Sequence, residues 1–174
     1  MSETKTDNDT VRILGTYTDT VSKVADPTEA FRAAEDAAKR LIGHRLFTIM
    51  QFNPDTMEVR RRYSSNPEDY PPGGRKAKRD TGWGRHVLEQ GHVFIGYNAD
   101  DIRDNFDDHE VIERLGLASI LNMPIRNLGR TIGTINLLDV AGYYSEKDIP
   151  VASIIAGALT ASILLLNMRD EGCY

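Results

Sequence analysis

The stretch LASILNMPIRNLGRTIGTINLLD, residues 117–139, decides the fold of this chain. It contains two strand-like apolar runs around residues 127–129, Asn-Leu-Gly, which predict the glycine-bearing loop of a hairpin. Asn122 and Asn136 fall almost opposite each other in these otherwise apolar strands. Buried amides must be satisfied, so the pair either bonds to the backbone and to each other or meets a ligand. The sequence therefore predicts a buried antiparallel hairpin with two candidate ligand-binding amides.

The elements that precede and follow the hairpin are marked by capping and turn residues. Asp26 and Pro27 open a helix with an N-cap and a proline at its first position, and Gly43 ends it. Residues 46–63 are typical of two strands joined by an Asn-Pro-Asp turn. Residues 145–148 form a capping box for the last helix. The other predicted elements are a short helix from Asp80 or Thr81 to Gly91, a strand at 92–97 and a short helix at 107–116.

The last predicted helix, residues 149–168, carries no charge and is long enough to cross a bilayer. Ser153, Gly157, Thr160 and Asn167 nevertheless place small and polar side chains on one helical face. A helix that faces lipid has no need of such a stripe. We therefore expect a packed helix and no membrane association.

The N-terminal 25 residues divide into two predicted parts. Residues 1–10 are polar and are expected to form a disordered tail. Residues 11–25 repeat Val, Leu, Thr, Val and Ala at three- and four-residue steps, the spacing of helices that pack side by side. We expect this helix to form a homodimer with the C-terminal helix, or alternatively to fold back on its own chain. The domain itself is placed at 26–168, with a C-terminal tail at 169–174.

Composition narrows the class of protein. The 174 residues carry a net charge of −5, with 40% hydrophobic and 27% charged residues, as in a soluble domain that does not bind nucleic acid. The one cysteine, Cys173, favours a reducing compartment, and a cytoplasmic location is expected. The four histidines lack the spacing of metal ligands, so no metal site is expected.

The order of elements, the 117–139 hairpin and the segment YYSEKDIPVASIIAGALTASI (143–163) together resemble the GAF domain, from about Pro27 to Asn167. The resemblance implies an α+β fold: an antiparallel sheet with the N- and C-terminal helices on one face and a ligand pocket on the other. Loops and short helices would roof that pocket. Residues 63–84, a long irregular segment with the basic run RKAKR, would form part of the roof.

Known chemistries of the GAF family can be compared with this sequence. Methionine sulfoxide reduction and covalent bilin attachment need cysteines inside the domain, where this chain has none. The cyclic-nucleotide pattern matches at Asn98, Phe106 and Glu110 but lacks its lysine and aspartate. His86 or His92 could be argued as haem ligands, although no spacing favours it. No cofactor is therefore assigned.

Candidate pocket residues come from the roof and from the strand faces. Strict alternation places Arg61 and Tyr63 on the same face as Val59, where a guanidinium could fix a carboxylate or pair with a neighbouring acid. Trp83 and His86 begin a short helix, with Trp83 either contacting ligand or plugging the roof. The remaining candidates are Tyr97, Asn98, Asp101, Asn122 and Asn136.

Two classes of function remain open. The first is a stand-alone sensory or regulatory domain that binds a small, anionic organic molecule and signals to a protein partner, with RKAKR as an electrostatic funnel. The second is a small catabolic enzyme that uses His86 or Asp101 as an acid or base. The first is preferred, because the sequence shows no paired nucleophile and base, metal cluster or phosphate-binding loop.

Overall fold

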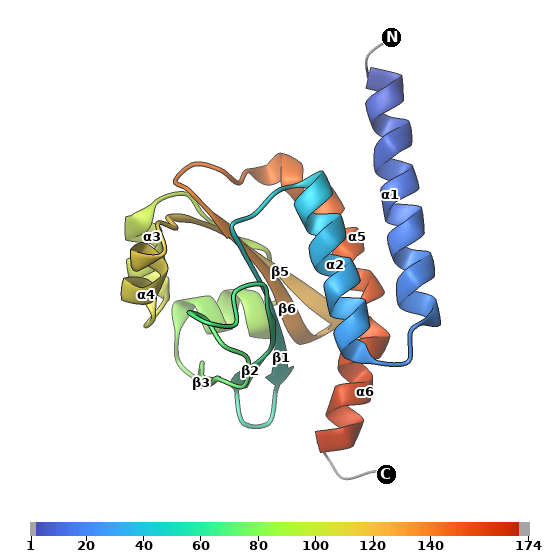
Figure 1. Ribbon diagram of the computed structural model, residues 1–174. Helices are drawn as coiled ribbons and strands as arrows, with labels where there is room; N and C mark the ends of the chain where they lie inside the picture. Colours follow the sequence, from blue (N-terminus) through green and yellow to red (C-terminus); the bar gives the residue numbers. More distant parts are fainter. Residues whose placement is uncertain (1–2, 171–174) are drawn as a thin grey trace.

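The computed structural model describes residues 3–170, which form an antiparallel sheet with helices on both of its faces (Figure 1). The strand order is β3-β2-β1-β6-β5-β4. The strands are β1 (Leu46–Asn53), β2 (Glu58–Ser64), β3 (Arg75–Ala77), β4 (Phe94–Gly96), β5 (Ser119–Asn127) and β6 (Arg130–Asp139). The predicted α+β fold, with terminal helices on one face and a roofed site on the other, is confirmed.

The central pair β5–β6 has the predicted hairpin geometry. Leu128 and Gly129 form its two-residue turn, and both have positive φ, 48° and 81°, as a turn that matches the twist of the strands requires. Asn122 lies directly opposite Asn136 in the ladder. Leu121 and Leu137 on the alternate face are fully buried under the helices. The two faces of the hairpin therefore differ. One face carries apolar side chains of the core, and the other carries the asparagine pair.

The larger core lies between the sheet and four helices. These are α1 (Glu3–Lys23), α2 (Pro27–Leu41), α5 (Ile149–Ala158) and α6 (Thr160–Asp170). The side chain of Asp26 caps α2 by accepting from the backbone N–H of Thr28, as expected. The alanines of α2 are buried, which allows the helix to approach the sheet closely. In Figure 1, α2 and α5 cover the sheet and α1 lies outside them.

Helix α1 differs from the expected tail and helix. It begins at Glu3, so residues 3–10, expected to be disordered, are helical. Its inner face packs on α2 and α5, where the buried Tyr17 hydroxyl donates to the carbonyl of Ile155 (2.7 Å). Leu14 and Val21 of the proposed dimer seam also pack against this core, whereas Val11 is exposed. The helix therefore does fold back on its own chain.

The predicted C-terminal helix is broken in two. Residues 146–148 form a 3₁₀ turn with the expected capping box, and α5 ends at Ala158. The Thr160 hydroxyl contacts the carbonyls of Gly157 (2.9 Å) and Arg126 (3.1 Å), at a 44° bend into α6. Within the described residues, no single helix could span a membrane, although this bent pair has the necessary length and composition. Helix α6 reaches Asp170, beyond the predicted end, and Cys173 lies outside the described residues.

The opposite face of the sheet carries shorter elements. These are the π-helical turn η1 (Gly84–Glu89), α3 (Ala99–Asn105) and α4 (His109–Arg114), whereas β3 is an edge strand of the sheet itself. The Thr81 hydroxyl accepts from the backbone N–H of Gly84, so the predicted cap is present. Helix α3 was missed by the sequence analysis, and the strand predicted at 92–97 shortens to β4. Figure 1 shows α3 and α4 on the side of the sheet away from α1.

A β-bulge interrupts β2 and overturns the strict alternation predicted for it. Met50 of β1 pairs with Arg61 and Ile49 pairs with Tyr63, so Arg62 is the extra residue. The side chain of Arg61 therefore faces the roofed side, whereas Tyr63 faces the helices. The Tyr63 hydroxyl donates to the Glu35 carboxylate of α2.

Candidate ligand-binding site

A small cavity lies between the sheet and the roof segments. Its floor is formed by side chains of the central strands, among them Thr48, Met50, Ile120, Asn122, Asn136 and Leu138. Its walls and roof include Tyr70, Lys76, Lys78, Trp83, Phe106 and Asp108. The cavity has a volume of about 30 Å³, which is room for one or two water molecules. An organic ligand would therefore need part of the roof to move.

A row of polar side chains crosses the floor. Asn136 donates from Nδ2 to Oγ1 of Thr48 (3.0 Å), and Asn122 donates from Nδ2 to Oδ1 of Asn136 (2.7 Å). Trp83 completes the row from the roof, because its indole N–H donates to Oδ1 of Asn122 (3.0 Å). In this state the two amides satisfy each other and the indole takes the remaining acceptor. The structural alternative for the asparagine pair is thus realised together with a contact to the roof.

Trp83 fills the space beneath the roof. Its side chain is 5% exposed, and the Phe106 ring meets it edge-on with ring centroids 5.7 Å apart. The Lys78 ammonium lies 5.6 Å from the centroid of the indole. The cluster continues into Val87 of η1 and into Val59 of strand β2. Trp83 therefore fills the roof in this structure, and its contact with a ligand stays a prediction.

Basic side chains gather along one wall of the cavity. The ammonium of Lys76 lies 2.6 Å from Oδ2 of Asp108, and the Arg61 guanidinium lies 3.8 Å from the same oxygen. Arg61 also stacks over the ring of Tyr70, 3.6 Å from its centroid, and Tyr70 donates its hydroxyl to Asp108. Lys78 is buried, and its ion-pair partner Asp107 is 83% exposed. Within the basic run RKAKR, the side chains of Lys76 and Lys78 therefore line the cavity.

The environment of this wall shifts the pKa of three groups. Burial lowers the pKa of Lys78, and the exposed Asp107 only partly opposes the shift. Burial alone would raise the pKa of Asp108, but the nearby Lys76 ammonium and hydrogen bonds from Lys76 and Tyr70 hold it below its usual range. Burial, followed by the charge of Asp108, raises the pKa of Tyr70. The wall therefore places a carboxyl group and basic side chains together where solvation is poor.

Two predicted site residues lie away from the cavity. Tyr63 packs between Phe31 and Phe47 in the helix-side core, because of the bulge in β2. His86 on η1 contacts the carbonyl oxygen of Val93 through Nε2 (3.0 Å). Its ring also lies against that of His92. Both side chains are engaged in local structure.

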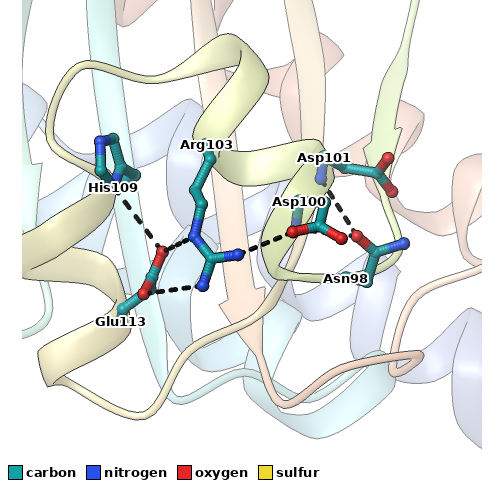
Figure 2. A network of polar contacts seen from close by, with 6 residues as sticks. All are labelled: Asn98, Asp100, Asp101, Arg103, His109 and Glu113. Atoms are coloured by element: carbon teal, nitrogen blue, oxygen red, sulfur yellow. Dashed lines mark hydrogen bonds and ion pairs between the residues drawn. The ribbon is translucent and has the colours of Figure 1, made fainter.

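The predicted wall of Tyr97, Asn98 and Asp101 has a structural role at the start of α3. The Asn98 side chain accepts from the backbone N–H groups of Asp100 and Asp101 and caps the helix. The Asp101 carboxylate accepts from the backbone N–H of Tyr97, whose side chain is exposed. Figure 2 shows how the capped helix connects onward, through Arg103, to the next helix. Within the described residues these three side chains do not line the cavity.

Arg103 fixes α3 against α4. Its guanidinium binds Glu113 of α4 through two contacts, Nε to Oε1 (2.7 Å) and Nη2 to Oε2 (3.1 Å), and also contacts Asp100 (2.7 Å) (Figure 2). His109 lies 3.7 Å from Glu113 in the same network. The two helices and the segment between them, which carries Phe106 and Asp108, are thereby held as one unit of the roof.

Sequence reasoning missed several cavity residues. The alternation of Lys76 and Lys78 in RKAKR was a usable signal, because side chains two residues apart in a strand share a face. Tyr70 and Asp108 carried no such signal, since both lie in irregular chain and meet only in three dimensions. Asn122, Asn136 and Trp83 were predicted and do meet.

A second hollow of about 410 Å³ lies at the end of the β1–β2 hairpin beside α6. Its lining includes Arg60, Arg75 and Arg130 together with Asp55 and Asp170. It is larger than the roofed cavity, but its lining is mostly polar, with acids and bases interspersed. The roofed cavity combines apolar side chains with a few directed polar and charged groups, which is the composition of a small-molecule site.

The profile of the GAF domain matches residues 24–163, and the chain therefore belongs to the GAF domain family. GAF domains are sensory and regulatory domains that bind small molecules. No curated protein sequence is a significant match.

Solved structures with the same fold come from both sensory and enzymatic proteins. The chain is similar to the GAF domain of a phosphoenolpyruvate-protein phosphotransferase from Coxiella burnetii, with 15% identity and a TM-score of 0.74 over 95% of this chain and 97% of that one. It is similar to the chromophore-binding domain of a bacteriophytochrome from R. palustris, with 16% identity and a TM-score of 0.70 over 93% and 63%. It is also similar to a free methionine-R-sulfoxide reductase from Neisseria meningitidis, with 12% identity and a TM-score of 0.65 over 92% and 91%. At these identities the likeness shows the shared fold.

Proposed function

We propose that this GAF domain is a sensor that binds a small organic anion in the roofed cavity and passes the binding state to a protein partner. The observation that carries the proposal is the basic wall: Lys76 and Lys78 line the cavity, and Arg61 contacts the lining residue Asp108 from outside it. Among the described residues that line the cavity, two are basic, Lys76 and Lys78, and one is a carboxylate, Asp108. An anion that enters would supply the missing charge where solvent screens it least.

Arg61 has capacity to bind such a ligand. Its Nη1 donates to the carbonyl of Pro71 (2.9 Å), but its Nε is buried without a partner among the described residues. A buried donor of this kind is unfavourable unless it is hydrogen-bonded. A carboxylate or phosphate oxygen is the acceptor that a guanidinium binds most strongly.

The sensory proposal is tested by a thermal-shift screen of small carboxylates, phosphates and sulfonates with the purified chain. A ligand that binds only the folded state raises the melting temperature in proportion to the logarithm of its concentration. Lys76→Met with Lys78→Met should abolish the shift. Arg79→Met removes a charge from the same segment but at an exposed position, so it should retain the shift. No shift with any anion, or an equal loss in the control, would count against the proposal.

The enzymatic alternative receives less support from the geometry. His86 and Asp101, its candidate acid and base, are both engaged in local hydrogen bonds outside the cavity. A general acid or base must reach the reacting group directly or through one water. Incubation of the purified chain with any anion found in the screen should accordingly leave that compound unchanged, as followed by mass spectrometry.

We also propose that two copies of the chain associate through their terminal helices. Val11 on α1 and Ile154 on α5 are exposed, although the two helices pack against each other. Apolar side chains exposed on neighbouring helices are typical of surfaces that a partner covers. A homodimer would cover them with the same surface of a second copy.

A further inference from the structure

We infer that the ligand of the roofed cavity is a planar ring compound that carries both a ring N–H donor and an anionic group, and that it replaces the indole of Trp83. The inference rests on the proposed function, since it describes the anion that the sensor binds. Trp83 already occupies the space between the polar floor and the basic wall. Its side chain is therefore a template for the chemistry that fits there.

The hydrogen-bonding direction of the floor follows from the indole. An indole nitrogen can only donate, so the atom of Asn122 that faces it must be the carbonyl oxygen. This leaves Nδ2 of Asn122 for Oδ1 of Asn136, and Nδ2 of Asn136 for the Thr48 hydroxyl. When Trp83 withdraws in this arrangement, the floor presents an unpaired acceptor. A ligand that lacks a donor would leave this buried oxygen unsatisfied.

The shape and charge of the ligand follow from the other contacts of Trp83. The Phe106 ring packs edge-on against the indole at an interplanar angle of 63°, which suits a flat aromatic system in the same position. The Lys78 ammonium, 5.6 Å from the indole centroid, is within reach of a short acidic side chain on such a ring. Trp83 contributes the ring and the N–H but has no acidic group. The ligand thus gains an ion pair that the indole cannot make.

The exchange also explains the small volume of the cavity. A volume of about 30 Å³ has no room for a ring while Trp83 is inside. Withdrawal of the indole vacates a ring-shaped site, and the apparent affinity is reduced by the fraction of molecules in which Trp83 is inside. Because Trp83 immediately precedes η1, its withdrawal changes the roof and gives a binding event that a partner can sense.

The test compares three probes by isothermal titration calorimetry with the full chain. Indole-3-acetate carries the ring N–H and the carboxylate, 1-methylindole-3-acetate lacks the donor, and indole-3-acetamide lacks the charge. We expect indole-3-acetate to bind at least tenfold more tightly than either of the others, because each loses one directed interaction in a buried site. Equal or tighter binding of the N-methyl probe would overturn the inference, and this comparison needs no variant protein.

A variant gives a second measurement of the same exchange. Trp83→Phe keeps an aromatic plug but removes the indole N–H, so Oδ1 of Asn122 is left unpaired in the free protein. We expect indole-3-acetate to bind this variant about tenfold more tightly than the original chain, while 1-methylindole-3-acetate gains less. Unchanged binding of indole-3-acetate would show that the ligand does not take over the contact of Trp83, and would overturn the inference.

Failure of the inference is distinguishable from failure of the proposed function. Organic anions in the thermal-shift screen could stabilise the chain while the three indole probes show no preference for the ring N–H. That result would support the anion sensor and contradict the inference that the ligand replaces the indole of Trp83. If no anion stabilises the chain, the proposed function itself falls. Tighter binding of the acetamide than of the acetate would likewise remove the role of Lys78 in the inference.

Discussion

Lys78 illustrates, for a single residue, how the proposed anion binding would oppose stability. Its ammonium is buried beside Trp83 and Phe106, and burial lowers its pKa. We expect Lys78→Met to raise the free energy of unfolding by about 1 kcal/mol, because an apolar side chain of similar length avoids the desolvation of a charge. The same variant should bind anions more weakly. Urea denaturation at neutral pH measures the first effect, and a less stable variant would contradict it.

The dependence on pH gives a sharper check on Lys78. Between its lowered pKa in the folded state and the value of about 10.4 in the unfolded chain, only the unfolded state binds the proton. The stability of the original chain therefore gains a contribution as the pH rises through the folded pKa. The advantage of Lys78→Met should accordingly shrink as the pH approaches 10.

Asp108 balances the basic wall in the absence of ligand. We expect Asp108→Asn to destabilise the fold at low ionic strength by about 3 kcal/mol, since it leaves Lys76 and Arg61 without their shared carboxylate. Added phosphate should restore more stability to this variant than to the original chain. The control Asp104→Asn removes a charge from an exposed position of α3 and should change stability by less than about 0.5 kcal/mol. Thermal melts in a phosphate series measure both, and an equal response would refute the expectation.

The lowered pKa of Asp108 also determines how the stability of the fold changes at acidic pH. Its contribution to stability is fully present above the unfolded pKa of about 3.9 and is lost as the pH falls through the lower folded value. Asp108→Asn should lack this component of acid unfolding, whereas the exposed control Asp104→Asn should retain it.

Individual site residues were predictable where their chemistry conflicted with their surroundings. Asn122 and Asn136 stood out as amides in apolar strands, and their pairing followed from the hairpin. Asn98 and Asp101 were misassigned to a ligand wall because a capping side chain and a binding side chain share the same residue types. The sequence indicates that a polar side chain needs a hydrogen-bond partner, but it does not indicate whether that partner is the backbone or a ligand.

At the scale of elements, the segment from β3 to η1 positions Trp83 through a tight backbone contact. A Cβ atom on Gly84 would lie 2.3 Å from the carbonyl oxygen of Lys78 and 2.7 Å from Oγ1 of Thr81. We expect Gly84→Ala to cost about 2 kcal/mol and to displace the indole. Since Trp83 is the only tryptophan of the chain, its fluorescence should shift to longer wavelength as the ring becomes solvated.

The matched control for this element is Gly82→Ala. A Cβ atom at Gly82 meets no heavy atom within 4 Å. Its substitution should leave both the emission maximum and the free energy of unfolding nearly unchanged. If the two variants behave alike, the contact between Gly84 and Lys78 does not hold Trp83 in place.

Long, strongly patterned elements were predictable and short ones were not. The β5–β6 hairpin and the start of α2 carried both periodicity and cap chemistry, and both formed as expected. Helix α3 is too short for its periodicity to be recognised, and it depends on the Arg103–Glu113 contact with α4. The break between α5 and α6 depends on the Thr160 contact with the distant Arg126 carbonyl, which no local pattern reveals.

At the scale of the whole molecule, the proposed dimer can be tested without damage to the core. Leu14 and Val21 pack on the chain's own helices and are poor probes, so we choose Val11 and Ile154, 69% and 47% exposed. The original chain should sediment at twice 19.5 kDa at micromolar concentration, and the double Asp variant as a monomer, because the charges would be buried unpaired. Leu128→Asp, at a position 96% exposed on the β5–β6 turn, should remain a dimer. An original chain that sediments as a monomer would refute the dimer.

The fold as a whole was more predictable than its site. In each long helix or strand, many residues together indicate which side packs against the core. The fold is therefore predicted by several independent patterns. The site depends on a few side chains from segments far apart in the chain, such as Tyr70, Asp108 and Trp83. These side chains come together because of the path of the irregular backbone, and sequence periodicity does not predict that path.

The bulge in β2 bears on how sequences of this kind should be aligned. Arg62 has no partner in the ladder, yet Arg61 and Tyr63 on either side of it are both paired with β1. Removal of Arg62 would close the ladder and leave Arg61 toward the cavity and Tyr63 toward the helices, each facing as before. A homologue one residue shorter here would therefore keep both roles when the gap is placed at Arg62. A gap placed earlier in the strand would misalign Arg61, and a gap placed later would misalign Tyr63.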